Sequence, residues 1–248
     1  MTLMAGKGKG RRYYSYVDQK SQKHKLRWII AGVLVFSVFY AAITSMFFSM
    51  RVMRNDTMAP NFVSGERFIF SSYNFYSLIY GPELAKDPLP FRRGNVVLVD
   101  MFREKRPNIF LSILDGVVRF FTIQRVSLTE RKEDMFVKRI IGLPGDEITM
   151  TNFVIRVRTK GSSYSLTEFE VTDYDYTLEI PQVPSLWDSS LPFFGSMESV
   201  VLGENECFVL SDDRGNINDS RTWGPVPIAN ISGKALFRYW PFNRFGRV

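Results

Sequence analysis

The longest apolar run in the chain covers residues 28–50 and contains no charged side chain. As an α-helix, these 23 residues would measure roughly 34 Å, enough to cross a bilayer core of about 30 Å with some tilt. The run is longer than the apolar part of a typical cleaved signal peptide, and no A-x-A-like site ends it. We therefore expect an uncleaved transmembrane anchor over 28–50, with a cleaved signal peptide as the alternative.

After this run, short β-type segments alternate with turn-rich ones. Gly, Pro, Asn and Asp gather between segments that are rich in β-branched and aromatic residues, and VIRVR within 153–159 alternates apolar and charged side chains. The expected strands are 67–70, 95–100, 135–141, 153–159, 177–180, 206–211 and 233–240. The pattern predicts a mostly antiparallel β domain over residues 51–248.

One segment, residues 108–126, has helical rather than strand spacing. Its apolar positions follow a period near 3.6 and are Phe110, Ile113, Leu114, Val117, Val118 and Phe121. Asp115 and Arg119 lie four residues apart on the opposite side, at the spacing of a weak ion pair. We expect an amphipathic helix within an insertion over 101–135. It would pack on its own domain or, as the alternative, lie on a membrane surface.

The net charge of +7 comes from the N-terminal tail. Residues 1–28 contain eight Lys or Arg and one acid, Asp18, while the rest of the chain balances 24 basic against 24 acidic groups. A nucleic-acid-binding surface is therefore not expected. Since positive flanks stay in the cytoplasm, residues 1–27 should form a basic cytoplasmic tail and residues 51–248 should lie on the other side of the membrane.

The chain contains one cysteine, Cys207, and one histidine, His24. Cys207 cannot form an intramolecular disulfide and is expected to be a small buried apolar residue. His24 lies in the basic tail, which excludes a Ser-His-Asp triad and a multi-His zinc site in the exported part. No metal or cofactor is expected, and a hydrolase built on this chain needs another general base.

A candidate base lies in FVKRIIGLPGDEI, residues 136–148. Successive side chains of a strand point to opposite faces, so Lys138 and Arg139 should diverge, one into a cavity and the other solvated or paired. A lysine on a strand is usually a surface charge. If it is buried, however, desolvation lowers its pKa toward neutrality, and the free amine can then accept a proton from a hydroxyl.

Four segments together resemble the boxes of type I signal peptidase, the membrane-anchored Ser-Lys peptidase family. FVKRIIGLPGDEI is similar to the family's Lys-Arg-Val-Val-Gly-Leu-Pro-Gly-Asp box, and SDDRGNINDSRTWGPVP, residues 211–227, is similar to its Asp-, Arg- and Trp-containing box. RRGNVVLV resembles the Arg-Gly-Asp-Val-Val box, and NDTMAPNFVSGE resembles the box that carries the nucleophile. The boxes cover about 50 residues. Residues 101–135 and 150–205 match less well and resemble an insertion and a variable cap.

The resemblance implies a role for each matched residue. Thr57 takes the position of the nucleophile and Lys138 that of the general base, while the N–H of Thr57 and the side chain of Asn55 would form the oxyanion hole. Supporting positions fall on Met58, Pro60, Arg139, Asp212, Arg214, Asp219, Ser220 and Arg221. Met58 would pack near the substrate, Pro60 would shape the turn, and the charged residues would brace the site through ion pairs.

Three departures from the family pattern concern the chemistry. Thr57 stands where the family has Ser, which keeps the hydroxyl but adds a methyl group that restricts χ1. Asn55 replaces a Ser, and its amide can still donate to an oxyanion. Ile217 replaces a Ser that hydrogen-bonds the lysine in the family, which Ile cannot do. Asp56, if close to Lys138, would raise the lysine pKa and disfavour the free base.

The implied function is that of a signal peptidase I. It would be a single-pass protein of the bacterial cytoplasmic membrane that removes signal peptides from exported preproteins, with the lipid bilayer and those peptides as partners and no nucleic acid. The departures at positions 55, 57 and 217 motivate an alternative. In that reading the chain is a catalytically impaired paralogue that binds peptides or partners at the membrane. Retention of Lys138 and the bracing charges favours the enzyme.

Overall fold

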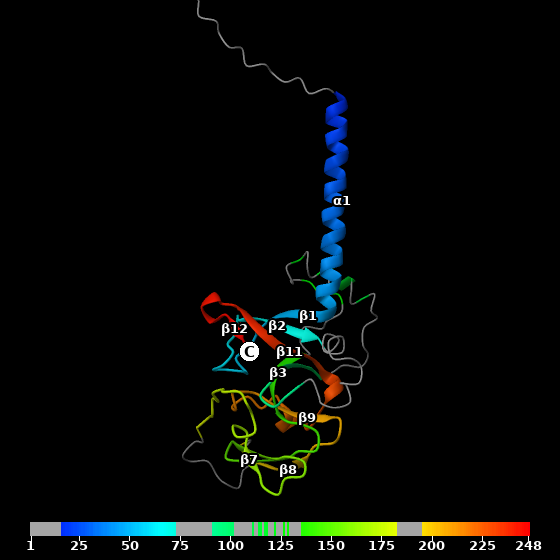
Figure 1. The fold of residues 1–248 in the computed structure, drawn as a ribbon. Helices are drawn as coiled ribbons and strands as arrows, with labels where there is room; N and C mark the ends of the chain where they lie inside the picture. The colour runs from blue at the N-terminus through cyan, green and yellow to red at the C-terminus, as the bar shows by residue number, and fades with distance from the viewer. Residues whose placement is uncertain are drawn as a thin grey trace, which may run out of the picture.

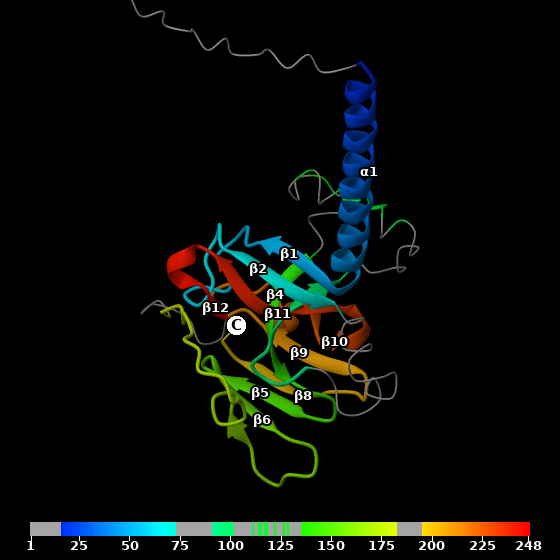
Figure 2. The same ribbon diagram turned by 45° about the horizontal axis from the view of Figure 1, so that its top comes forward.

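The computed structural model describes residues 16–72, 91–101, 135–182 and 195–248, together with isolated positions between 111 and 128. Helix α1, Tyr16–Phe47, comes first and projects away from the strands in both views (Figures 1 and 2). The segment 28–50, expected as an anchor, lies on α1 up to Phe47 and continues into strand β1, Phe48–Val52.

Within the part of the chain that the structure describes, no helix combines the length and the apolar character needed to cross a membrane.

The larger sheet is antiparallel and runs in the order β1-β2-β11-β3-β4-β9-β10, with β12 paired to β11. Its further strands are β2 Arg67–Ser72, β3 Val96–Asp100, β4 Met135–Gly142, β9 Glu206–Leu210, β10 Val226–Pro227, β11 Ile231–Trp240 and β12 Gly246–Arg247. Three short helical segments connect them: α4 Ser220–Trp223, η2 Ile228–Asn230 and η3 Phe242–Arg244. Strand β4 therefore lies inside the sheet, where the side chains on both of its faces can be buried.

A smaller antiparallel sheet has the order β7-β6-β5-β8 and lies at the end of the molecule away from α1 (Figure 2). Its strands are β5 Glu147–Thr151, β6 Val154–Arg158, β7 Leu166–Thr167 and β8 Met197–Val201. Most of it belongs to the region 150–205 that was expected to be a variable cap. The alternating burial along β6, with Ile155 and Val157 inside, matches the predicted half-exposed strand.

The two faces of β3 divide the core of the larger sheet. Val96 and Leu98 belong to one buried cluster with Met58 and Phe62, whereas Val97 and Val99 belong to another with Cys207 and Ile140. This separation follows from the two-residue period of a strand. The predicted burial of Cys207 is confirmed; burial raises the pKa of its thiol to about 12.

The fold class predicted from sequence, a mostly antiparallel β domain, is confirmed, and six of the predicted strands coincide with β2, β3, β4, β6, β9 and β11. The strand predicted over 177–180 is wrong. Only Glu179 pairs there, in an isolated parallel bridge to Asp213. TLEI has strand composition, but composition does not supply a neighbouring strand with which to form a ladder.

The helix expected over 108–126 lies largely outside the described residues. Five positions within it, Leu111, Leu114, Asp115, Val117 and Val118, are helical. Asp115 is buried rather than on an exposed polar face, and its carboxylate accepts the N–H of Leu128. Its expected partner, Arg119, is outside the described part of the chain.

Candidate active site

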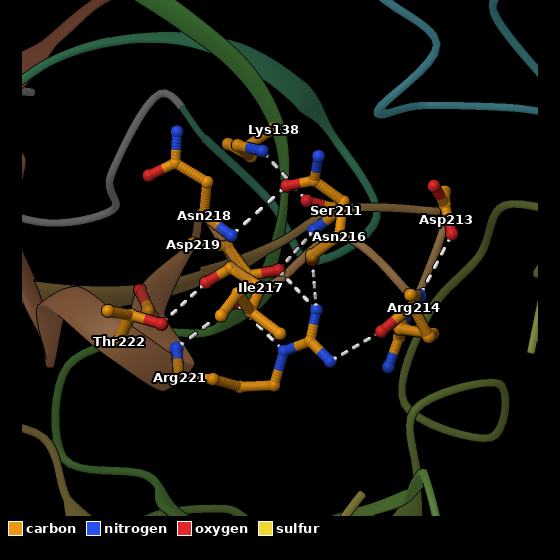
Figure 3. A network of polar contacts seen from close by, with 12 residues as sticks. Lys138, Ser211, Asp213, Arg214, Asn216, Ile217, Asn218, Asp219, Arg221 and Thr222 are labelled. Carbon is orange, nitrogen blue, oxygen red and sulfur yellow. Dashed lines mark hydrogen bonds and ion pairs between the residues drawn. The ribbon is translucent and has the colours of Figure 1, made fainter. Parts of the chain in front are cut away.

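Lys138 and Arg139 diverge from β4, as the strand pattern predicts, and both are buried. The Nζ of Lys138 donates a hydrogen bond to the hydroxyl of Ser211 at 2.7 Å (Figure 3) and lies 5.7 Å from the centre of the Trp223 ring. The Lys138 side chain is 0% exposed. The usual interpretation of a strand lysine, a solvated surface charge, is therefore excluded for this residue.

Burial lowers the pKa of Lys138 from 10.5 to about 8. The carboxylate of Asp219 opposes this effect and the guanidinium of Arg221 adds to it, while Asp212 and Asp213 raise the pKa to a smaller extent. Desolvation has the largest effect because a buried ammonium loses its hydration. Lys138 can thus release its proton near neutral pH, which a solvent-exposed lysine cannot do.

Arg139 forms a buried bidentate ion pair with Asp212. Its Nε lies 2.7 Å from Oδ1 and one terminal nitrogen lies 2.5 Å from Oδ2, while the other donates to the carbonyl of Gly94 at 2.8 Å. The guanidinium also stacks over the ring of Tyr176 at 4.0 Å. These contacts fix the backbone after β9 against β4, close to Lys138.

Asp219 organises the turn that follows Ser211 (Figure 3). Its carboxylate accepts the N–H of Ser211 at 3.0 Å and the guanidinium of Arg221, and it also accepts the N–H of Arg221 as the N-cap of α4. Burial would raise the pKa of Asp219, but hydrogen bonds and charge from Arg221 outweigh burial, so its pKa lies below the usual value. Beside it, the buried hydroxyl of Ser220 accepts the N–H of Val209 at 3.0 Å.

Arg221 and Arg214 connect this turn to the rest of the domain. Arg221 donates to the carbonyl of Arg214 at 2.7 Å. Arg214 is fully buried and pairs with Glu168 at 2.5 Å, and the same carboxylate accepts the hydroxyl of Tyr176 at 2.9 Å. Burial, followed by the charge of Glu168, raises the pKa of Tyr176 well above its usual value, so it stays a hydrogen-bond donor.

Thr57 lies on the loop between β1 and β2 and is nearly buried, with 8% of its surface exposed. Its hydroxyl donates to the side-chain oxygen of Asn55 at 3.1 Å, and its carbonyl accepts the N–H of Asp213 at 3.2 Å. The loop is tied down again by Asn61, whose amide donates to Asp212 at 2.8 Å. The Thr57 loop therefore binds the segment that begins at Ser211, the residue in contact with Lys138.

The residues next to Thr57 differ in burial and in their contacts. Met58 is fully buried in the cluster that contains Phe62, whereas Pro60 is exposed and follows a cis peptide bond. The carboxylate of Asp56 accepts the N–H of Ser64 at 2.6 Å and is not among the groups that shift the pKa of Lys138. The carboxylates with the largest effects on Lys138 are Asp219, Asp212 and Asp213.

Four residues that the sequence did not single out join the site: Ser211, Asn61, Glu168 and Tyr176. Ser211 and Asn61 lie inside the quoted boxes, so their position was a usable signal, although their partners were not. Glu168 and Tyr176 lie in the less matched region 150–205 and carried no sequence signal. Within the described residues, no three His, Cys, Asp or Glu side chains group as metal ligands would.

Known proteins resemble this chain over most of its length. A sequence model of the family described as "Signal peptidase, peptidase S26" matches residues 25–240. The chain is 34% identical over 183 residues to "Signal peptidase I" of Bacillus caldolyticus, covering 72% of this chain and 84% of that protein.

Two further relatives are matched over shorter stretches. "Probable signal peptidase I-1" of Synechocystis is 31% identical over 113 residues, 46% of either chain. "Probable thylakoidal processing peptidase 2, chloroplastic" of Arabidopsis thaliana is 32% identical over 115 residues, 46% of this chain and 25% of that one. This chain thus spans less than half the length of these two relatives.

Proposed function

We propose that this chain, which belongs to the signal peptidase family of peptidase S26, cleaves signal peptides from exported preproteins with Thr57 as nucleophile and Lys138 as general base. The family predicted from sequence is confirmed. The buried Lys138, with its pKa lowered to about 8, is the observation that supports the enzymatic reading most strongly. A scaffold protein gains nothing from a desolvated lysine, whose charge costs free energy to bury.

In the first half of the reaction, the neutral amine of Lys138 takes the proton of the Thr57 hydroxyl. The Thr57 oxygen then forms a bond to the carbonyl carbon of the scissile peptide. The tetrahedral intermediate collapses, the C–N bond breaks, and the Lys138 ammonium returns its proton to the leaving amine. The signal peptide is now an ester on Thr57, and Lys138 is again a free base.

In the second half, Lys138 accepts a proton from a water molecule, and the resulting hydroxide attacks the ester. Collapse of this intermediate breaks the bond to the Thr57 oxygen, which regains a proton from Lys138. The signal peptide leaves as a free carboxylic acid. One lysine thus serves as base and as acid in both halves, which requires a pKa close to the working pH.

Asn55 and the N–H of Thr57 are proposed to stabilise the oxyanion in both intermediates. The side-chain oxygen of Asn55 accepts the Thr57 hydroxyl, which leaves its amide nitrogen, a donor, for the oxyanion. Removal of one such donor typically lowers the rate by about 10²–10³. The hydrogen bond to Asn55 holds the Thr57 hydroxyl before the substrate arrives, and it has to break before the hydroxyl proton can pass to Lys138.

We further propose, from the uncharged apolar run over residues 28–50 and not from the helices that the structure describes, that this segment holds the protein in the cytoplasmic membrane, with the N-terminus inside and the β domain outside. Large apolar side chains of α1 are exposed, including Trp28 at 77%, Phe36 at 68% and Phe39 at 63%. Water is a poor environment for such a surface, and the basic residues before it favour the cytoplasmic side. In right-side-out vesicles, added protease should digest the β domain. Digestion of the tail alone would contradict this orientation.

The alternative function, a catalytically impaired paralogue that binds peptides or partners, rests on Asn55, Thr57 and Ile217, which stand where the family has serines. The experiment that separates the two uses the purified full chain in detergent, a labelled preprotein, and mass spectrometry of the products. The proposed function predicts one cut at the end of the signal peptide and a mature protein with a new N-terminus. Binding of the preprotein without any product would favour the paralogue and contradict the proposal.

A further inference from the structure

Ser211 is the residue through which β9 reaches the proposed base. In the register of β4 and β9, Arg139 lies opposite Leu210. The next step along both antiparallel strands places Ser211 opposite Lys138. Residues directly opposite each other in an antiparallel pair project from the same face of the sheet, so the two side chains must meet. The observed contact, 2.7 Å from Nζ to Oγ, follows from this register.

Both partners of this contact are held in place. The N–H of Ser211 is fixed by the carboxylate of Asp219 at 3.0 Å, and neither Ser211 nor Lys138 is exposed. The next residue, Asp212, is clamped by Arg139. The backbone that carries the Ser211 hydroxyl is thus held by hydrogen bonds at Ser211 and at Asp212. This arrangement is expected for a group that positions another side chain.

Position 217 supplies no hydroxyl to the lysine, because its side chain is Ile. The backbone at this point is used in another way, as the carbonyl of Ile217 accepts the hydroxyl of Thr222 at 2.6 Å. Among the described residues, Ser211 provides the hydrogen-bond acceptor for Nζ. The hydroxyl in contact with the lysine therefore comes from the end of β9 and not from the turn at position 217.

We infer that Ser211 is the positioning residue for Lys138, taking over the role that the missing hydroxyl at position 217 would have. This inference rests on the proposed function of Lys138 as the general base. With the amine neutral, one N–H donates to Ser211, which restricts rotation about the last side-chain bond and directs the lone pair to one side. An unrestrained amine would spend part of its time facing away from the nucleophile, and small misplacements of a reacting group cost up to about 10² in rate.

The test compares Ser211→Ala and Ser211→Cys with Ser71→Ala in the full chain. The thiol of Cys fills the space of Ser but accepts hydrogen bonds weakly. Ser211→Cys therefore provides a second variant to measure if Ser211→Ala does not fold. Ser71 is an equally buried serine of the same sheet, whose hydroxyl bonds the carbonyl of Lys234 at 3.3 Å, so its variant controls for the loss of a buried hydroxyl. Both Ser211 variants should lower kcat about 10–100-fold with KM unchanged, and Ser71→Ala should leave kcat as it is.

A second readout is independent of turnover: the pKa of Lys138, followed by nitrogen NMR of its Nζ. Ser211 accepts a hydrogen bond from the ammonium, so its loss should lower this pKa below about 8. The charged groups around the lysine, Asp219, Arg221, Asp212 and Asp213, are unchanged in both variants. A merely structural role would not move the titration.

The outcomes separate the two claims. Unchanged kcat in folded Ser211 variants overturns the inference, and so does a fall in kcat without any change in the Lys138 titration. A wild-type protein that does not cleave, but whose Lys138 pKa falls on Ser211→Ala, contradicts the proposed function while leaving the Ser211 contact established.

Discussion

Arg139 and Asp212 face each other across β4 and the end of β9 as a buried bidentate pair, with Nε 2.7 Å from Oδ1. The pair lies on the face of β4 opposite Lys138, next to Phe62 and Tyr176. Because Asp212 also binds Asn61 of the Thr57 loop, this one carboxylate joins the three segments that carry Thr57, Lys138 and Ser211. The site therefore depends on an ion pair that takes no part in proton transfer.

Breaking this pair should destabilise the protein strongly. Asp212→Ala leaves the buried guanidinium of Arg139 without its counter-charge, which typically costs about 3–5 kcal/mol of unfolding free energy. Urea unfolding of the full chain measures the loss. The matched control is Arg158→Ala, which breaks the half-exposed pair of Arg158 with Glu147 and should change stability by less than about 1 kcal/mol. Equal effects of the two variants would show that the buried pair is not structurally important.

The rate of preprotein cleavage should rise with pH with a midpoint near 8, because the proposed base, Lys138, would act as the neutral amine and its pKa is about 8. A pH profile of kcat/KM measures this midpoint in the free enzyme. Since the negative charge of Asp219 raises the lysine pKa, Asp219→Asn should move the midpoint to lower pH. A rate that falls as pH rises from 6 to 8 would contradict Lys138 as the base.

The free energy of unfolding should also depend on pH through the titration of Lys138. The folded state releases the Lys138 proton near pH 8 and the unfolded chain near 10.5, so the unfolded state binds more protons between these values. The free energy of unfolding contributed by Lys138 therefore rises with pH across that window and is constant below it. Lys138→Met lacks this contribution. Its stability relative to wild type should fall by about 3 kcal/mol between pH 7.5 and 10.5, measured by urea unfolding. A constant difference would mean that the lysine pKa is not lowered.

Gly233 of β11 should not tolerate a side chain. A Cβ at this position would collide with the carbonyl oxygen of Ser71 on β2, a backbone atom that cannot move without breaking the β2–β11 pairing. Gly233→Ala is expected to cost several kcal/mol, at the upper end for single substitutions. Gly246→Ala of β12 is the control, since its Cβ would meet no atom within 4 Å. Thermal unfolding of both variants provides the comparison.

The sequence predicted those parts of the molecule that depend on local pattern. The strands around Lys138 and within 206–211 are rich in apolar residues, and each is followed by a turn-rich segment, GLPGDE and SDDRGN. Strand β1 was missed because Phe48, Ser49 and Met50 continue an apolar run without a change of period. The short strand β8 was missed because MESVV does not alternate apolar and polar residues.

In the site, too, the sequence singled out some residues and not others. The resemblance singled out Thr57, Lys138 and the charged residues of the 211–227 box, and the structure joins these segments through Asp212 and Asp213. The role of Ser211 could not be predicted, because it depends on the register of two strands separated by more than 60 residues. That register includes a shift between Ile140 and Gly142 that no local pattern reveals.

The most direct test of Thr57 as the nucleophile is single-turnover cleavage of a labelled preprotein by the full chain at pH 9, with wild type, Thr57→Ser and Thr57→Ala side by side. Wild type and Thr57→Ser should both cleave, since both carry a hydroxyl at the position proposed for the nucleophile. Thr57→Ala should fall to the uncatalysed background. Cleavage that persists in a folded Thr57→Ala variant would contradict Thr57 as the nucleophile and, with it, the reaction proposed for this site.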